Sequence, residues 1–251
     1  GTHVAGIIAG NASSASGATP YVGMAPDAQL LVVRVADSSG SVSDDALIAG
    51  LEWAAAKRGE IEAARGLPTR LVANLSFGGL LGPNDGTSVC DLAISSFADA
   101  GMVVVPSAGN EHGQGVHTQG QLAAGASRDI AFASTIWARS SRMVASLWYE
   151  ADSEMSVEVI EDVALGLAER AVVFAGGQTS FGIGDAGSVR SGASTLTIAH
   201  TDEGVSGRHV LVSMDGTFDP GSLRLRLSAP GDVGGGTWHA WIDTAGAQVA
   251  W

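Results

Sequence analysis

The chain has 251 residues, enough to bury one large core or two smaller ones. Acidic residues outnumber basic residues 26 to 13, and the formal net charge at pH 7 is -13. This charge argues against nucleic acid or an anionic membrane surface as a partner. Apolar stretches are all shorter than about 18 residues, so the sequence predicts no membrane-spanning helix.

The chain contains one cysteine and begins with glycine. The single cysteine, Cys90, excludes an internal disulfide framework. It lies among apolar residues of a predicted helix, and we interpret it as a small buried side chain. Because the first residue is Gly1 and not Met, we expect the sequence to be an internal piece of a longer protein.

Apolar runs alternate with helical patterns in the first half of the chain. Residues 30–35, LLVVRV, are a continuous branched run that predicts a strand buried on both faces. A helix is predicted to follow, because Ser43 is a suitable N-cap and apolar residues then recur at helical spacing. Asp44 and Asp45 favour the positive end of its dipole.

The same alternation continues to about residue 125. Residues 70–76 predict a strand, residues 88–99 a helix, and residues 102–110 a strand that runs into a loop. Gly101 stands where a glycine often ends a helix. Strands alternating with helices predict a parallel sheet, in which ligands bind beyond the carboxyl ends of the strands, here at residues 76–79 and 107–110.

The second half has a different sequence pattern, in which apolar and polar residues alternate strictly. Leu223, Leu225 and Leu227, for example, alternate with polar residues that begin at Ser222. About eight short strand candidates, separated by turns rich in Gly, Asp and Pro, predict an antiparallel β-sandwich or jelly roll. They lie near Ala131, Met143, Met155, Ala171, Thr195, His209, Ser222 and Thr237. We therefore predict an α/β domain over residues 1–128 and a β-sandwich domain over residues 129–251.

Several segments of the first half resemble one family. GTHVAGIIAG at residues 1–10 resembles the histidine segment of the subtilases, and VGMAPDAQLLVVRV at residues 22–35 resembles their GVAP turn and the next strand. NLSFGG at residues 74–79 resembles the substrate-binding strand, and PSAGNEH at residues 106–112 resembles the AAGN segment. The motifs also follow the family's order. The resemblance implies a partial subtilisin-like core and a secreted serine endopeptidase that acts on peptides or proteins.

The resemblance also implies roles for residues of the NLSFGG and AAGN segments. Ser76, Phe77 and Gly78 would pair with the substrate and line the pocket for the residue before the cleaved bond. Ala108 and Gly109 would contact substrate beside Asn110, the implied oxyanion-hole residue. An amide there can donate to a tetrahedral oxyanion, which an aspartate at neutral pH cannot. The alternative is that Asn110 only adopts a turn.

A further substrate-binding segment follows from the same resemblance. Ser39, Gly40 and Ser41 fall where subtilases present an edge strand that pairs with the substrate through main-chain hydrogen bonds. On residue types alone, this triplet equally fits a plain loop.

None of the three triad residues is identified in this sequence. The resemblance places the catalytic histidine just before Gly1, so we interpret His3 as a packed, hydrogen-bonded structural residue. GTS at residues 86–88 resembles part of the nucleophile motif, but Ser88 precedes Asn110, and a helix N-cap suits it better. GPNDGTS at residues 82–88 also resembles a loop that some subtilases carry just after the substrate strand. A nucleophilic Ser88 is the alternative. We expect the catalytic Asp, His and Ser outside these residues and expect the segment alone to be inactive.

No metal site is predicted. His112 and His117 lie near Glu111, but their spacing matches no ligand motif, and we interpret them as solvated loop residues. The implied chemistry requires no cofactor, and the sequence leaves structural calcium open.

A rival interpretation is a non-catalytic module, either a degenerate protease or a β domain that binds protein or glycan. Trp148, Trp238 and Trp241 could form a sugar-binding platform, although their alternation favours the sandwich core. Both NLSFGG and SAGN are present, which favours the protease.

Overall fold

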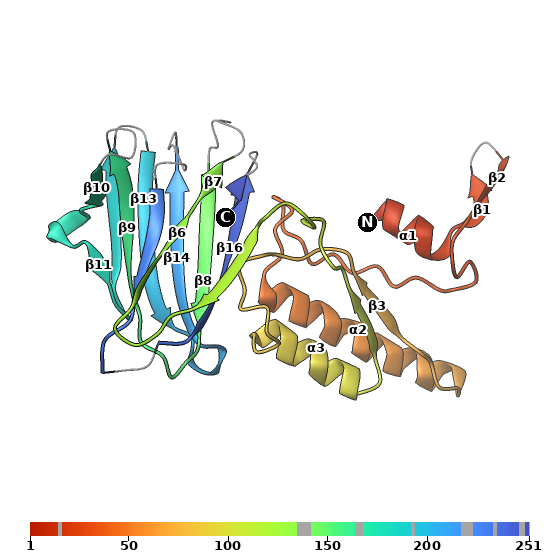
Figure 1. The fold of residues 1–251 in the computed structure, drawn as a ribbon. Helices are drawn as coiled ribbons and strands as arrows, with labels where there is room; N and C mark the ends of the chain where they lie inside the picture. The colour runs from red at the N-terminus through yellow and green to blue at the C-terminus, as the bar shows by residue number, and fades with distance from the viewer. Residues whose placement is uncertain are drawn as a thin grey trace. The chain divides into compact units, whose positions relative to one another are not determined.

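The computed structural model shows a mixed α/β chain that divides into two compact units (Figure 1). The described residues are 1–14, 17–134, 142–163, 168–191, 194–216, 223–232, 235–245 and 249–250. The first unit comprises Gly1–Gly78 and Val89–Ala108, and the second comprises Gly79–Ser88 and Gly109–Trp251. Residues 79–88 and 109–128 thus cluster with the β-rich part. The domain boundary at residue 128 stays a prediction.

The first unit holds the helices α1 (Thr2–Ala9), α2 (Asp44–Arg65) and α3 (Val89–Asp99). The start of α2 is as predicted, since the Ser43 side chain accepts a hydrogen bond from the Ala46 amide at 3.3 Å. The helix ends at Gly66, whose φ of 66° is left-handed. None of the helices among the described residues has the length and apolar character that a membrane crossing requires.

A left-handed glycine also ends α3. The Met102 amide donates to the Phe97 carbonyl at 3.1 Å, and the Gly101 amide donates to the Ala98 carbonyl at 2.9 Å. This pair of bonds is the Schellman motif, and Gly101 has the φ of 86° that the motif requires. The predicted helix end at Gly101 is confirmed.

A small parallel sheet completes the core of the first unit. Strand β3 (Val72–Leu75) pairs in parallel with β4 (Val103–Pro106), with Val72 opposite Val103 and Leu75 opposite Pro106. Leu51 of α2 packs with Leu75 and Met102 in the buried cluster beneath these strands. Nearer the N-terminus, β1 (Asn11–Ser14) and β2 (Gly17–Val22) form a hairpin.

The strand predicted at residues 30–35 is wrong. This segment is irregular, and Val32 is 80% exposed. Apolar content alone does not make a strand, because a strand needs a neighbour for its backbone groups. Within the described chain, β3 has β4 as its only partner. The segment packs on α2 instead, since a Cβ added to Gly50 would lie 2.6 Å from Val35 Cγ1 and 3.3 Å from Val33 Cγ1.

Two large antiparallel sheets make up most of the second unit (Figure 1). The six-stranded sheet has the order β12-β13-β14-β8-β16-β5. Its strands are β5 (His117–Gln121), β8 (Arg142–Tyr149), β12 (Ala186–Ser191), β13 (Ser194–Asp202), β14 (Arg208–Asp215) and β16 (Thr237–Ala245). The five-stranded sheet has the order β10-β9-β15-β6, with β11 also paired to β9. Its strands are β6 (Ser127–Ala131), β9 (Ser156–Val163), β10 (Ala168–Ala171), β11 (Ser180–Phe181) and β15 (Leu223–Ser228).

Minor elements complete the second unit. Strand β7 (Ala133–Ser134) pairs with β17 (Val249–Ala250), and η1 (Ala175–Gly177) and η2 (Gly204–Ser206) are short 3-10 helices. Strands occur at the predicted sites in this half, although Ser222 lies outside the described residues. Strands β5 and β12 were not predicted.

The two large sheets share one core, as strict alternation predicts. Leu223, Leu225 and Leu227 of β15 point inward, and so do Leu147 of β8 and Trp238 of β16. Because neighbouring residues of a strand point to opposite faces, the residues between these point outward. Ser146 and Trp148 of β8 and Trp241 of β16 thus belong to the outer face of the six-stranded sheet.

Candidate functional site

The carboxyl ends of β3 and β4 lie side by side in the first unit. The Ser107 amide donates to the Leu75 carbonyl at 2.9 Å, and Ser107 Oγ donates to the Phe77 carbonyl at 3.1 Å. The NLSFGG and PSA segments are therefore joined just beyond the sheet. This is the edge at which parallel sheets bind ligands. Sequence reasoning places Ser107 among the residues just after a strand, where ligands bind, but does not assign it this bond.

The predicted substrate-binding residues of NLSFGG are exposed at this edge. Ser76 and Gly78 are exposed, and Phe77 is 36% exposed. Ser76 Oγ accepts a hydrogen bond from Asn74 Nδ2 at 2.8 Å, which fixes its side chain along the strand. An exposed extended segment offers main-chain donors and acceptors to a peptide.

Asn110 lies in an exposed loop that its neighbours order. Gly109 has a φ of 84°, and a Cβ there would come within 2.5 Å of Glu111 Oε2. Glu111 Oε2 accepts from the backbone amide of Asn110 at 2.6 Å, and Gln114 Nε2 donates to the backbone carbonyl of Asn110 at 3.1 Å. These bonds hold the backbone of Asn110, and the residue itself is exposed to solvent. Ala108, two residues earlier, is also exposed.

Ser39, Gly40 and Ser41 form a turn and not the edge strand that the resemblance implies. The carboxylate of Asp37 organises the turn, because its Oδ1 accepts from the Ser39 amide at 2.8 Å, Ser39 Oγ at 2.7 Å and the Ser41 amide at 3.0 Å. The Ser39 hydroxyl contributes most to lowering the pKa of Asp37, followed by the Ser41 amide. Gly40 supplies the φ of 88°. Substrate binding by these residues stays a prediction.

Three further residues of the first half are placed by the structure. His3 lies in α1 but is exposed, so the packed position expected for it is wrong. Ser88 directly precedes α3, at the position of a helix N-cap. Cys90 is partly buried, and burial, followed by a hydrogen bond with Asp44, raises its pKa to about 12. Such a thiol is unreactive at neutral pH.

His117 is exposed, as predicted, but it lies in strand β5 and not in a loop. Its Nε2 is 3.1 Å from His239 Nδ1, and its ring stacks on Trp241 at 4.7 Å. Burial, followed by the charge of His239, lowers the pKa of His117. His112 is exposed in a turn. In the described ranges, no group of three or more His, Cys, Asp or Glu side chains is arranged to hold a metal ion.

The three tryptophans divide between the two faces of the six-stranded sheet, and Trp241 is buried although it is on the outer face. Trp238 is buried in the core, as predicted, whereas Trp148 and Trp241 lie on the outer face of the six-stranded sheet. Trp148 Nε1 donates to the Leu81 carbonyl at 2.9 Å and to Ser146 Oγ at 3.0 Å. The Ser146 hydroxyl in turn donates to the Leu81 carbonyl at 2.7 Å. These bonds fix the loop of residues 79–88 on the sheet.

Comparison with known proteins assigns the family. The model of the subtilase family, peptidase family S8, matches residues 1–247. The chain belongs to the subtilase family. The family is one of serine peptidases.

Known subtilases match part of this subtilase chain. Subtilisin E of Bacillus subtilis is 38% identical over 115 residues, which are 46% of this chain and 25% of that protein. The thermostable alkaline protease of Halalkalibacterium halodurans is 36% identical over 117 residues, which are 47% of this chain and 27% of that protein. The chain thus spans about a quarter of these relatives.

A solved structure resembles nearly the whole subtilase chain. The CspB protease of Clostridium perfringens aligns with a TM-score of 0.66 at 18% identity, over 95% of this chain and 48% of that one. At this identity the match concerns the fold alone. It covers the β-rich half as well as the parallel sheet.

Proposed function

We propose that this subtilase chain is an internal part of a serine endopeptidase that cleaves peptide bonds by acyl transfer. In such a reaction a serine, activated by a histidine that an aspartate orients, attacks the peptide carbonyl. We expect these three residues to lie outside residues 1–251. The observation that carries the proposal is the hydrogen bond from Ser107 Oγ to the Phe77 carbonyl. It joins the two segments with which subtilases bind the substrate and stabilise the oxyanion.

The proposed substrate contacts follow from exposure at the carboxyl edge of the sheet. Ser76, Phe77 and Gly78 would pair with the peptide backbone, and the turn at residues 39–41 would bind beside it. Asn110, in an ordered loop two residues past Ala108, would donate its side-chain amide to the oxyanion. A backbone held by Glu111 and Gln114 supports such a role, because a preorganised donor needs little rearrangement.

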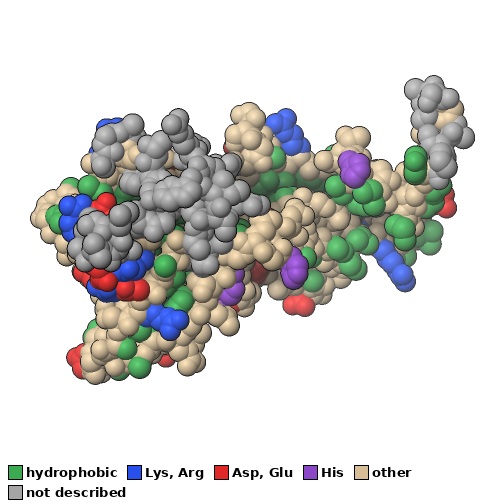
Figure 2. All heavy atoms as spheres, turned by 45° about the horizontal axis from the view of Figure 1, so that its top comes forward, with side chains coloured by type: hydrophobic (Ala, Val, Ile, Leu, Met, Phe, Trp, Pro, Cys, Tyr) green, Lys and Arg blue, Asp and Glu red, His purple; other side chains and the backbone are tan. Residues whose placement is uncertain are grey.

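Exposed apolar side chains of the first unit support a larger catalytic domain. Figure 2 shows hydrophobic side chains on its surface, and Tyr21, Met24 and Val32 are 82%, 89% and 80% exposed. Large apolar side chains gathered at a surface indicate that another surface covers them. We propose that further subtilase core packs there and that the β-rich part, residues 129–251, is an inserted jelly-roll-like domain. We further propose that the whole protein acts outside the cell.

The test of the protease proposal is active-site labelling of the full-length protein. A fluorophosphonate probe should label a serine outside residues 1–251, and the 251-residue chain alone should neither be labelled nor hydrolyse peptides. Labelling of Ser88 would contradict the proposed arrangement. No labelling of a folded full-length protein would favour a non-catalytic module.

The Asn110→Asp variant tests the oxyanion role in the full-length protein. It keeps the side-chain volume and replaces the amide donor with a carboxylate, so kcat should fall by about 100- to 1,000-fold. That magnitude is the one established for the oxyanion-hole asparagine of subtilisin. Asn11→Asp, the same exchange in the β1–β2 hairpin, is the control and should retain activity. Equal activities of the two variants would contradict the role of Asn110.

A further inference from the structure

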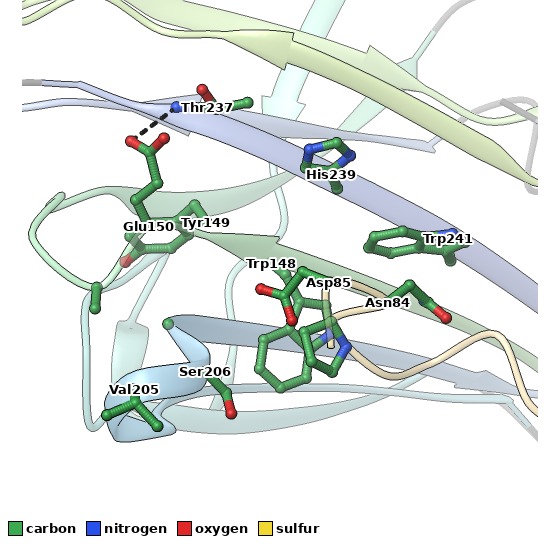
Figure 3. A pocket seen from close by; sticks show the side chains of 13 residues that line it. Asn84, Asp85, Trp148, Tyr149, Glu150, Val205, Ser206, Thr237, His239 and Trp241 are labelled. Carbon is green, nitrogen blue, oxygen red and sulfur yellow. Dashed lines mark hydrogen bonds between the residues drawn. The ribbon is translucent and has the colours of Figure 1, made fainter. Parts of the chain in front are cut away.

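A pocket of about 390 Å³ opens on the outer face of the six-stranded sheet (Figure 3). Its floor comes from Trp148 of β8 and from His239 and Trp241 of β16, which lie along adjacent strands. Its walls are residues 83–85 of the loop and residues 205–207 at the end of η2, all within the second unit. Its volume lies in the range of small-ligand sites.

The indole rings of the pocket are held in place by contacts outside it. Trp148 stacks on His209 at 4.2 Å between ring centroids and hydrogen-bonds to the Leu81 carbonyl. Trp241 stacks on His117 at 4.7 Å. Rings fixed in this way lose little side-chain entropy when a ligand binds, so the surface is preorganised.

Two carboxylates face the same pocket. Asp85 Oδ1 accepts from the Thr87 amide at 2.9 Å and from Thr87 Oγ1 at 2.6 Å. Glu150 Oε2 accepts from the Thr237 amide at 3.3 Å, as the dashed line of Figure 3 shows. These bonds orient both groups, and each carboxylate has a second oxygen for a ligand. No Lys or Arg is among the described residues that line the pocket.

We propose that this pocket binds the basic side chain, Arg or Lys, of a peptide segment. The cation would lie between the carboxylates of Asp85 and Glu150 and against the indoles of Trp148 and Trp241. Charge-assisted hydrogen bonds and cation–π attraction both favour such an arrangement. The net charge of -13 would also attract a basic segment.

A sugar also stacks on indole rings, but it is neutral and provides no positive charge for the two carboxylates. We therefore commit to the basic peptide. This binding site goes beyond the proposed protease, because it lies wholly in the β-rich unit and requires no triad residue. Binding alone tests it.

The experiment is a calorimetric titration of the 251-residue chain with acetyl-Ala-Arg-Ala-amide and with its citrulline counterpart. Citrulline has the shape of arginine without the charge. The Arg peptide should bind at least about tenfold more tightly. Its affinity should fall as salt is added.

Two variants locate the binding in the pocket. Asp85→Asn keeps an oxygen for the bonds from Thr87, and Glu150→Gln keeps one for the bond from the Thr237 amide. Each variant should weaken binding of the Arg peptide by about fivefold or more. Glu52→Gln is the matched control, since Glu52 is exposed on α2 in the first unit. It should leave the affinity unchanged. Thermal unfolding of each variant shows whether its fold is intact.

Several results would overturn the proposal. They are equal affinity for the Arg and citrulline peptides, no binding of either at millimolar concentration, or equal binding by the pocket variants and Glu52→Gln. Binding of a methyl glycoside that the Arg peptide does not displace would assign the pocket to a sugar and would also overturn it. If a pocket variant fails to fold, the comparison of the two peptides on the parent chain still decides.

Discussion

Ser107 Oγ donates a hydrogen bond of 3.1 Å to the carbonyl of Phe77, and this bond continues the pairing of β3 and β4 beyond their last residues. The two strands end at Leu75 and Pro106, so the bond spans the loops that carry the proposed substrate contacts. It fixes the spacing of these loops without occupying the exposed side of Ser76 or Gly78. A peptide could therefore pair there on a backbone that is already ordered.

Ser107→Ala should loosen this edge of the sheet. The loss of one hydrogen bond to a partly exposed carbonyl should lower the free energy of unfolding by about 1 kcal/mol. Urea unfolding measures this change. Ser95→Ala, an exposed serine on α3, is the control and should change stability by less than about 0.5 kcal/mol. Equal losses in the two variants would show that the Ser107 bond contributes nothing.

Glycine-to-alanine exchanges should have opposite effects at two positions of the first unit. Gly101→Ala adds a Cβ to the residue whose φ of 86° the Schellman motif requires. This strain should lower the free energy of unfolding by about 1 to 2 kcal/mol. Gly59→Ala lies inside α2 with open space around the added Cβ, and should stabilise by up to about 1 kcal/mol. Thermal unfolding measures both. Shifts of the same sign would contradict the assigned helix ends.

Local signals account for the elements that the sequence predicts well. The Ser43 cap, the Gly101 end and the alternation of Leu223, Leu225 and Leu227 each act within a few residues. Elements that depend on distant partners are less visible. Residues 117–121, HTQGQ, are polar and form β5 only because β16 pairs with them. The two strands are far apart in sequence: Thr237 of β16 lies opposite Gln121, 116 residues earlier. Residues 30–35 show the converse, an apolar run without a strand partner.

The candidate site follows the same division. A parallel sheet places the carboxyl ends of neighbouring strands together, so the sequence marks residues 76–79 and 107–110 as candidates for ligand binding. The bond between Ser107 and Phe77 agrees. The pocket of the β-rich unit was not predicted. Trp148, Trp241, Asp85 and Glu150 converge only through strand register and a folded-back loop, which residue types alone do not specify.

His209 should make the β-rich unit sensitive to acid. Burial lowers its pKa to about 4, because its ring lies between Trp148 and the Ser146 hydroxyl, with Nε2 3.0 Å from Ser146 Oγ. The unfolded chain takes up the proton near pH 6.5, whereas the folded chain does so only near pH 4. Stability is therefore complete above pH 6.5 and falls between pH 6.5 and 4, by about 1 to 3 kcal/mol.

His209→Gln should reduce this loss, since glutamine does not take up a proton in this range. The measurement is urea unfolding followed by tryptophan fluorescence at several pH values. His112→Gln, an exposed histidine in a turn, is the control and should retain the full pH dependence of the parent. His200 is also buried with a lowered pKa, so some pH dependence should remain in His209→Gln. A pH profile identical to that of the parent would show that His209 is not responsible.

The loop of residues 79–88 should open from the six-stranded sheet more easily when Trp148 loses its indole N–H. This loop directly follows Gly78 and is fixed to the six-stranded sheet by the bonds of Trp148 Nε1 and Ser146 Oγ to the Leu81 carbonyl. Trp148→Phe keeps an aromatic ring against His209 and removes one of these bonds, so local opening should become easier by about 1 kcal/mol. Limited proteolysis should then cut within residues 79–88 about five times faster. Trp53→Phe, at a 43% exposed position of α2, is the control and should be cut at the parent rate. If both variants are cut at that rate, the Trp148 bond does not restrain the loop, which Ser146 and Ser206 also hold through the Leu81 and Thr87 carbonyls.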